Sequence, residues 1–65
     1  MINKEVERRV AGYCIARTMT EDEYNLVVDK LAEAIWESGE TISDEELVRL
    51  GVKLINQIVE SRKRQ

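Results

Sequence analysis

Residues 42–59 read Ile-Ser-Asp-Glu-Glu-Leu-Val-Arg-Leu-Gly-Val-Lys-Leu-Ile-Asn-Gln-Ile-Val, and this stretch decides the fold. Its apolar residues recur at helical spacing and form two stripes that lie about 100° apart around the helix axis. The two stripes are Leu47–Leu50–Leu54–Ile58 and Val48–Val52–Ile55–Val59. A helix with two apolar stripes needs two apolar neighbours, so the stretch predicts a bundle in which the last helix packs against two others.

The same kind of start signal precedes this helix and the one before it. Ser43 is followed three residues later by Glu46, and Thr20 is followed by Glu23, which is the spacing of a capping box. Apolar residues stand where a hydrophobic staple would place them, Met19 with Tyr24 and Ile42 with Leu47. Two helix N-termini can therefore be assigned from local chemistry.

Together these signals predict helices over about residues 3–18, 21–38 and 44–63. The second should stop at Gly39, because glycine readily takes the left-handed conformation that ends many helices. The first is less clearly delimited, and a strand over residues 10–16 is the competing interpretation, although alanine and glycine are poor strand formers. We expect a single all-α domain over residues 1–65, a compact three-helix bundle.

The second half of the first helix is apolar on every side, which a monomeric bundle does not explain. A helix of this kind is expected to be surrounded, yet in a monomer one side of residues 10–16 would face water. A chain of 65 residues is also close to the lower size limit for a single core, and with one cysteine and no histidine it has neither a disulfide nor a Cys/His zinc site to compensate. We therefore predict a homodimer whose interface contains Val10, Ala11, Cys14 and Ile15. A monomer remains the alternative.

The composition argues against several kinds of chemistry. Without histidine there is no imidazole base and no ordinary serine or cysteine triad, and Cys14 is expected to be a buried structural thiol. The chain has no glycine-rich phosphate loop, and the carboxylates of Asp29, Glu33 and Glu37 lack a second acidic helix with which to share a magnesium ion. We expect no enzymatic activity, no metal and no cofactor. With no long apolar run and no signal-like N-terminus, we also expect no membrane partner and a cytoplasmic location.

Charge is distributed unevenly along the chain. The net charge is +2 over residues 1–19, −9 over residues 20–46 and +4 over residues 47–65. A helix-turn-helix protein would insert the first turn of its last helix into the major groove, but here that turn is the acidic Asp44–Glu46, which DNA phosphates would repel. This charge distribution argues against nucleic acid as a partner, and a small DNA-binding regulator that uses its basic N- and C-terminal segments is the alternative function.

An acidic line follows the second helix opposite its core stripe. Asp29, Glu33 and Glu37 repeat at four-residue intervals, and each like-charge pair costs a few tenths of a kcal/mol in a free helix, roughly 0.2–0.5. Together with Asp22, these acids occupy a narrow arc of the helix surface; Leu26 lies in the middle of this arc, and Trp36, the only tryptophan, lies at its edge. Because tryptophan is enriched at binding hot spots, we predict that a partner protein with a basic surface binds to Leu26, Asp29, Glu33, Trp36 and Glu37.

The predicted function is thus a non-enzymatic interaction module: a small regulator, adaptor or inhibitor. Two other interpretations of the acidic line stay open. It could serve only to keep the protein soluble, with Trp36 folded back over the edge of the core. Alternatively, Arg8, Arg9 or the basic tail of Arg62, Lys63 and Arg64 could neutralise it within the same chain.

Replacing Thr20 or Ser43 with alanine should lower the free energy of unfolding by about 1 kcal/mol, because each side-chain oxygen accepts a hydrogen bond from a helix N-terminus. Thermal unfolding followed by circular dichroism measures both effects. Unchanged midpoints for both variants would mean that the helix starts are misplaced.

Overall fold

The computed structural model describes residues 2–63, and all the regular structure in that range is helical. Helix α1 spans Lys4–Ala16, α2 spans Glu21–Glu37 and α3 spans Asp44–Lys63. The predicted three-helix fold is confirmed, and the strand considered for residues 10–16 is not formed. The largest difference is at the end of α1, which stops two residues before the expected position.

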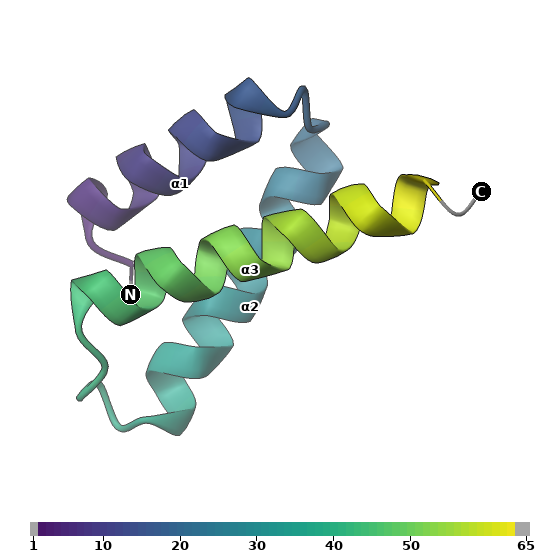
Figure 1. Ribbon diagram of the computed structural model, residues 1–65. Helices are drawn as coiled ribbons and strands as arrows, with labels where there is room; N and C mark the ends of the chain where they lie inside the picture. Colours follow the sequence, from purple (N-terminus) through teal and green to yellow (C-terminus); the bar gives the residue numbers. More distant parts are fainter. Residues whose placement is uncertain (1, 64–65) are drawn as a thin grey trace.

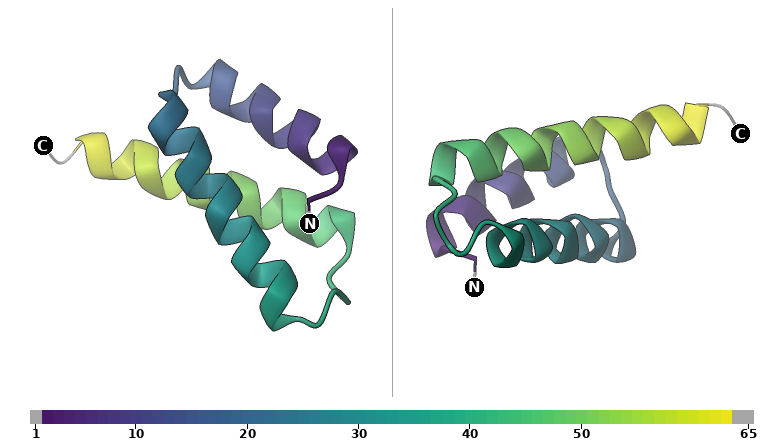
Figure 2. Two further views of the ribbon diagram at one scale, coloured as in Figure 1. Left: turned by 180° about the vertical axis from the view of Figure 1, so that it is seen from behind. Right: turned by 90° about the horizontal axis from the view of Figure 1, so that it is seen from below.

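Helix α3 is the central element, and α1 and α2 each pack mainly against it (Figure 1). Helices α1 and α3 begin at the same end of the molecule and run in similar directions, while α2 crosses α3 (Figure 2, left). The last turns of α3 project past both of the other helices, as the views of Figures 1 and 2 agree. The two apolar neighbours predicted for α3 are therefore present.

Within residues 2–63, no helix is both long enough and apolar enough to cross a membrane.

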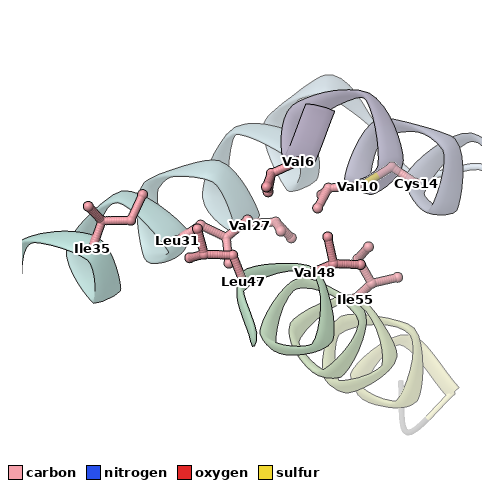
Figure 3. Close-up of a cluster of buried hydrophobic side chains, with 9 residues drawn as sticks. All are labelled: Val6, Val10, Cys14, Val27, Leu31, Ile35, Leu47, Val48 and Ile55. Carbon is pink, nitrogen blue, oxygen red and sulfur yellow. The ribbon is translucent and has the colours of Figure 1, made fainter. Parts of the chain in front are cut away.

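Each helix contributes three side chains to one buried cluster (Figure 3). They are Val6, Val10 and Cys14 from α1, Val27, Leu31 and Ile35 from α2, and Leu47, Val48 and Ile55 from α3. On α2 the buried line advances by four residues at each step, and the neighbouring Tyr24 and Val28 are only partly buried at its margins. Full burial of one valine, leucine or isoleucine stabilises the fold by about 1.5–3 kcal/mol, so this cluster is the main source of stability.

Gly51 lies where α1 meets α3. A Cβ atom built on Gly51 would be 3.0 Å from Val10 Cγ2 and 3.6 Å from Leu31 Cδ1. The buried glycine therefore lets a core valine of α1 and a core leucine of α2 reach the same turn of α3. Gly12, in contrast, has no such neighbour within 4 Å of a Cβ position and lies on the exposed side of α1.

The predicted N-terminal caps are formed. The Thr20 N–H donates to Glu23 Oε1 at 2.9 Å, and the Glu23 N–H donates to Thr20 Oγ1 at 3.2 Å, so both halves of this capping box are present. At α3 the Glu46 N–H donates to Ser43 Oγ at 3.2 Å. These bonds satisfy backbone donors that would otherwise have no partner in the first turn of a helix.

Helices α1 and α2 both end with a residue in the left-handed conformation, although the sequence predicted such a residue only for α2. After α2, Gly39 has φ +65, and the Glu40 N–H donates back to the Ile35 carbonyl at 3.0 Å. After α1, Thr18 occupies the equivalent left-handed position with φ 50, and the Met19 N–H donates to the Cys14 carbonyl at 3.0 Å. Both patterns are Schellman motifs. The expectation that α1 reaches Thr18 was wrong, because the chain leaves the helix at Arg17 and takes the left-handed conformation at Thr18.

Alanine at the two helical glycines should have opposite effects. Gly12→Ala should raise the free energy of unfolding by about 0.5–1 kcal/mol, because alanine is the better helix former and the site is open. Gly51→Ala makes the same gain in propensity, but its Cβ would crowd Val10, which is 1% exposed and has no room to move. Overpacking of this kind costs about 1–3 kcal/mol, so the net effect should be destabilising. Chemical denaturation of both variants provides the comparison, and a stabilised Gly51→Ala would contradict the close approach.

Candidate interaction surface

The acidic line of α2 is exposed along its length. Asp29, Glu33 and Glu37 all face solvent, since they lie opposite the buried line of the same helix. The ion pairs found between described residues join Arg8 to Glu5, Arg9 to Glu45 and Arg62 to Glu23. None of them reaches the acidic line, so neutralisation by Arg8 or Arg9 is not supported. Arg64 of the predicted basic tail lies outside the described residues.

The two apolar residues of this surface are both accessible. Trp36 is 85% exposed and Leu26 is 49% exposed. The indole of Trp36 therefore does not cover the edge of the core. Ten residues separate the two side chains, which corresponds to about 15 Å along a helix that rises 1.5 Å per residue. Leu26 and Trp36 accordingly stand at different ends of the acidic line rather than forming one joined anchor.

Leu26 borders a groove of about 230 Å³ between α2 and the C-terminal half of α3. The groove is lined by Leu26, Val27, Lys30, Leu54, Gln57, Ile58 and Ser61. Leu54 and Ile58 belong to a stripe that the sequence assigns to the core, and they are only partly buried. No local signal in the sequence could have revealed that Leu54 and Ile58 are only partly buried, because their exposure depends on how far α2 extends over α3.

The four residues predicted for the dimer interface lie on different sides of α1. Val10 and Cys14 are 1% and 4% exposed and belong to the core of the protomer. Ala11 is partly exposed and Ile15 is 77% exposed, so these two are the accessible part of the predicted set. Burial, together with the nearby Glu23 carboxylate, raises the pKa of the Cys14 thiol above its ordinary value. This shift favours the unreactive protonated form.

Glu23 has a second role that the sequence did not reveal. Beyond its place in the capping box, its carboxylate accepts a hydrogen bond from Arg62 Nε at 2.9 Å and a further one from the same guanidinium. These bonds join the first turn of α2 to the last turn of α3. The hydrogen bonds from Arg62, and next the backbone bond from Thr20, lower the pKa of Glu23 from its ordinary 4.5 to about 2. The sequence suggested that Arg62, as part of the basic tail, could neutralise the acidic line of α2, but its partner is Glu23, which lies outside that line.

The carboxylates do not gather into a chelating group. Within residues 2–63, no set of three His, Cys, Asp or Glu side chains is arranged so that it could hold a metal ion. The acids of α2 lie in a line along one helix, an arrangement better suited to contacting an extended basic surface than to enclosing a cation.

Comparisons of the chain with protein-family models, with curated proteins and with solved structures found no match. The function therefore has to be argued from the surface itself.

Replacing Arg62 with alanine should lower the unfolding midpoint at neutral pH and reduce its pH dependence in acid. The pKa of Glu23 is lowered by folding, so its contribution is complete above about pH 4.5 and is lost as the pH falls towards about 2. Lys63→Ala is the matched control, because Lys63 lies in the same turn and has no ion pair among residues 2–63. Melting curves between pH 2 and 7 measure both variants. Equal acid sensitivity of Arg62→Ala and the unmodified protein would show that the pair does not stabilise the fold.

Proposed function

We propose that this protein is a non-enzymatic interaction module, a small regulator, adaptor or inhibitor that binds a basic partner protein on α2. The observation that carries the proposal is Trp36, which is 85% exposed beside an acidic line without ion pairs among residues 2–63. An aromatic side chain of this size gains most when it is buried, and tryptophan is prominent among residues that dominate binding energy. A partner that covers Trp36 would therefore supply much of the affinity.

The acidic line supplies the second part of the argument. Asp29, Glu33 and Glu37 repel one another along α2, a cost that folding alone does not compensate. Basic side chains of a partner would relieve this repulsion when it binds. Electrostatic complementarity of this kind chiefly accelerates association and selects among partners, whereas buried apolar anchors slow dissociation. The two features of α2 thus have complementary roles.

A small DNA-binding regulator remains the alternative, with less support. Arg9 and Arg62 already donate to Glu45 and Glu23, which leaves fewer bases of the terminal segments for phosphates. The first turn of α3 is acidic, whereas phosphate contacts dominate the affinity of most DNA-binding proteins.

The variants Glu33→Lys and Trp36→Ala test the proposed surface once affinity capture and mass spectrometry have identified the partner. Glu33→Lys removes two like-charge contacts, so stability should be equal or slightly higher while association slows at low salt. Trp36→Ala should weaken binding by about 2 kcal/mol, chiefly through faster dissociation. Biosensor kinetics measure both effects, and melting curves establish that the variants fold. Glu60→Lys, the same charge reversal on an exposed position of α3, is the matched control. Full binding by both folded variants would refute the surface.

We further propose that the protein forms a homodimer through the outer face of α1. Ile15 is 77% exposed next to Ala11, and the two line a shallow groove of about 230 Å³ that continues to Met19 and Tyr24. A twofold copy would cover this aliphatic surface with its own. The buried Val10 would then support the interface from beneath, whereas Cys14 lines the groove at its base.

The dimer should have twice the chain mass in light scattering at tens of micromolar, and its unfolding midpoint should rise with protein concentration. Ile15→Asp should give a folded monomer, because the side chain is mostly exposed within the protomer. A monomeric unmodified protein under these conditions would contradict the dimer.

A further inference from the structure

The groove between α2 and α3 has an aliphatic floor and an open rim. Val27 is fully buried at its base, and Leu54 and Ile58 of α3 are partly buried beside it. Leu26 forms the rim on α2 and leaves half of its surface accessible. The volume of about 230 Å³ is below the roughly 300–1,000 Å³ of pockets for small molecules. It suits one or two aliphatic side chains presented by another chain.

The two walls of the groove are held together close to this point. Arg62 follows Ile58 by one helical turn, and Glu23 precedes Val27 by one turn. The hydrogen bonds between Arg62 and Glu23 therefore clamp α3 to α2 directly beside the groove. Because the walls are tied in the free protein, little ordering is required when a ligand enters.

The charges beside the groove indicate the kind of ligand. Asp22, Asp29 and Glu33 stand four residues before, three after and seven after Leu26, so they share its face of α2. Lys30 is the one base that lines the groove on this helix. On the outer face of α3, the exposed Lys53 and Glu60 balance each other. Asp22, Asp29 and Glu33 do not line the groove itself, but they make the exposed face of α2 beyond Leu26 predominantly acidic. A helix seated in the groove would meet this face with its basic side chains.

We infer that this groove binds a basic amphipathic helix of the partner protein. Two aliphatic residues of that helix, at positions i and i+3 or i+4, enter between Leu26, Leu54 and Ile58. Lysine or arginine residues beside them pair with Asp22, Asp29 and Glu33. This inference rests on the proposed function and extends it, because it names the partner element and adds an aliphatic anchor in the groove to the aromatic anchor at Trp36.

The probe is a synthetic leucine–lysine peptide of about 18 residues, or five helical turns, with leucines on one face. One control peptide has the same composition in a scrambled order, and another has glutamate in place of lysine. Calorimetric titration of the full chain should show the patterned peptide binding about tenfold more tightly than the scrambled one, with no binding of the glutamate peptide.

The decisive variant is Leu26→Asp, which should fold because half of the side chain is exposed, and which should weaken peptide binding about tenfold. Ser61→Arg, at an exposed lining position, adds bulk and a positive charge to the groove and should have the same effect. Tyr13→Asp introduces the same charge at an exposed apolar residue of α1 outside both proposed surfaces and should leave binding unchanged. Circular dichroism establishes that each variant is folded.

The outcomes separate this inference from the proposed function. If Glu33→Lys weakens peptide binding but Leu26→Asp and Ser61→Arg do not, the acidic face binds bases and the groove inference is wrong. If only the groove variants weaken binding, the groove is supported and the electrostatic part of the proposed function fails. If Leu26→Asp abolishes self-association instead of peptide binding, the occupant is a second copy of this chain, and the inference of a basic partner helix is overturned.

Discussion

The packing of both outer helices on one turn of α3 is the constraint on which the rest of the structure depends. Gly51 makes it possible, because the space of its missing side chain is occupied by Val10 from α1 and Leu31 from α2. Interiors are packed as densely as organic crystals, so a single methyl group at this position has to displace a neighbour. Val10 and Leu31 both belong to the buried cluster, to which each helix contributes three side chains (Figure 3).

This central contact leaves the C-terminal half of α3 only partly covered. Helix α3 is the longest of the three and projects beyond α1 and α2 (Figure 1). Leu54 and Ile58 therefore remain accessible beside Leu26, although their spacing is that of core residues. The hydrogen bonds between Arg62 and Glu23 keep α3 close to α2 beyond the main core. The groove with aliphatic walls arises because α3 is longer than α2 and because the two helices cross.

A chain of this length cannot bury all of its large apolar side chains. Trp36, Ile15 and Leu26 are exposed on three separate parts of the surface. Trp36 and Leu26 flank the acidic line of α2, whereas Ile15 lies on α1 beside alanine and glycine. Natural sequences tend to depart from the rules of folding where function requires it, which is why these residues support the proposed contacts with a partner and with a second copy.

The sequence by itself determined the three helices and most of their ends. Capping bonds and helical periodicity act over three or four residues, so Thr20, Ser43 and Gly39 could be assigned without knowledge of the fold. The apolar stripes also identified α3 as the helix with two neighbours. The end of α1 was the exception, because its left-handed residue is Thr18 and not a glycine, so the sequence contains no marker of this helix end.

Only the tertiary structure decided which apolar residues reach the core and which stay outside. Val10 and Ala11 are adjacent in the sequence and both apolar, yet only Val10 points towards Gly51. The pairing of Arg62 with Glu23 and the groove beside Leu26 likewise join residues more than twenty-five positions apart. Such contacts depend on the angle and height at which helices cross, which arise from the packing of all three helices together and leave no local signature in the chain.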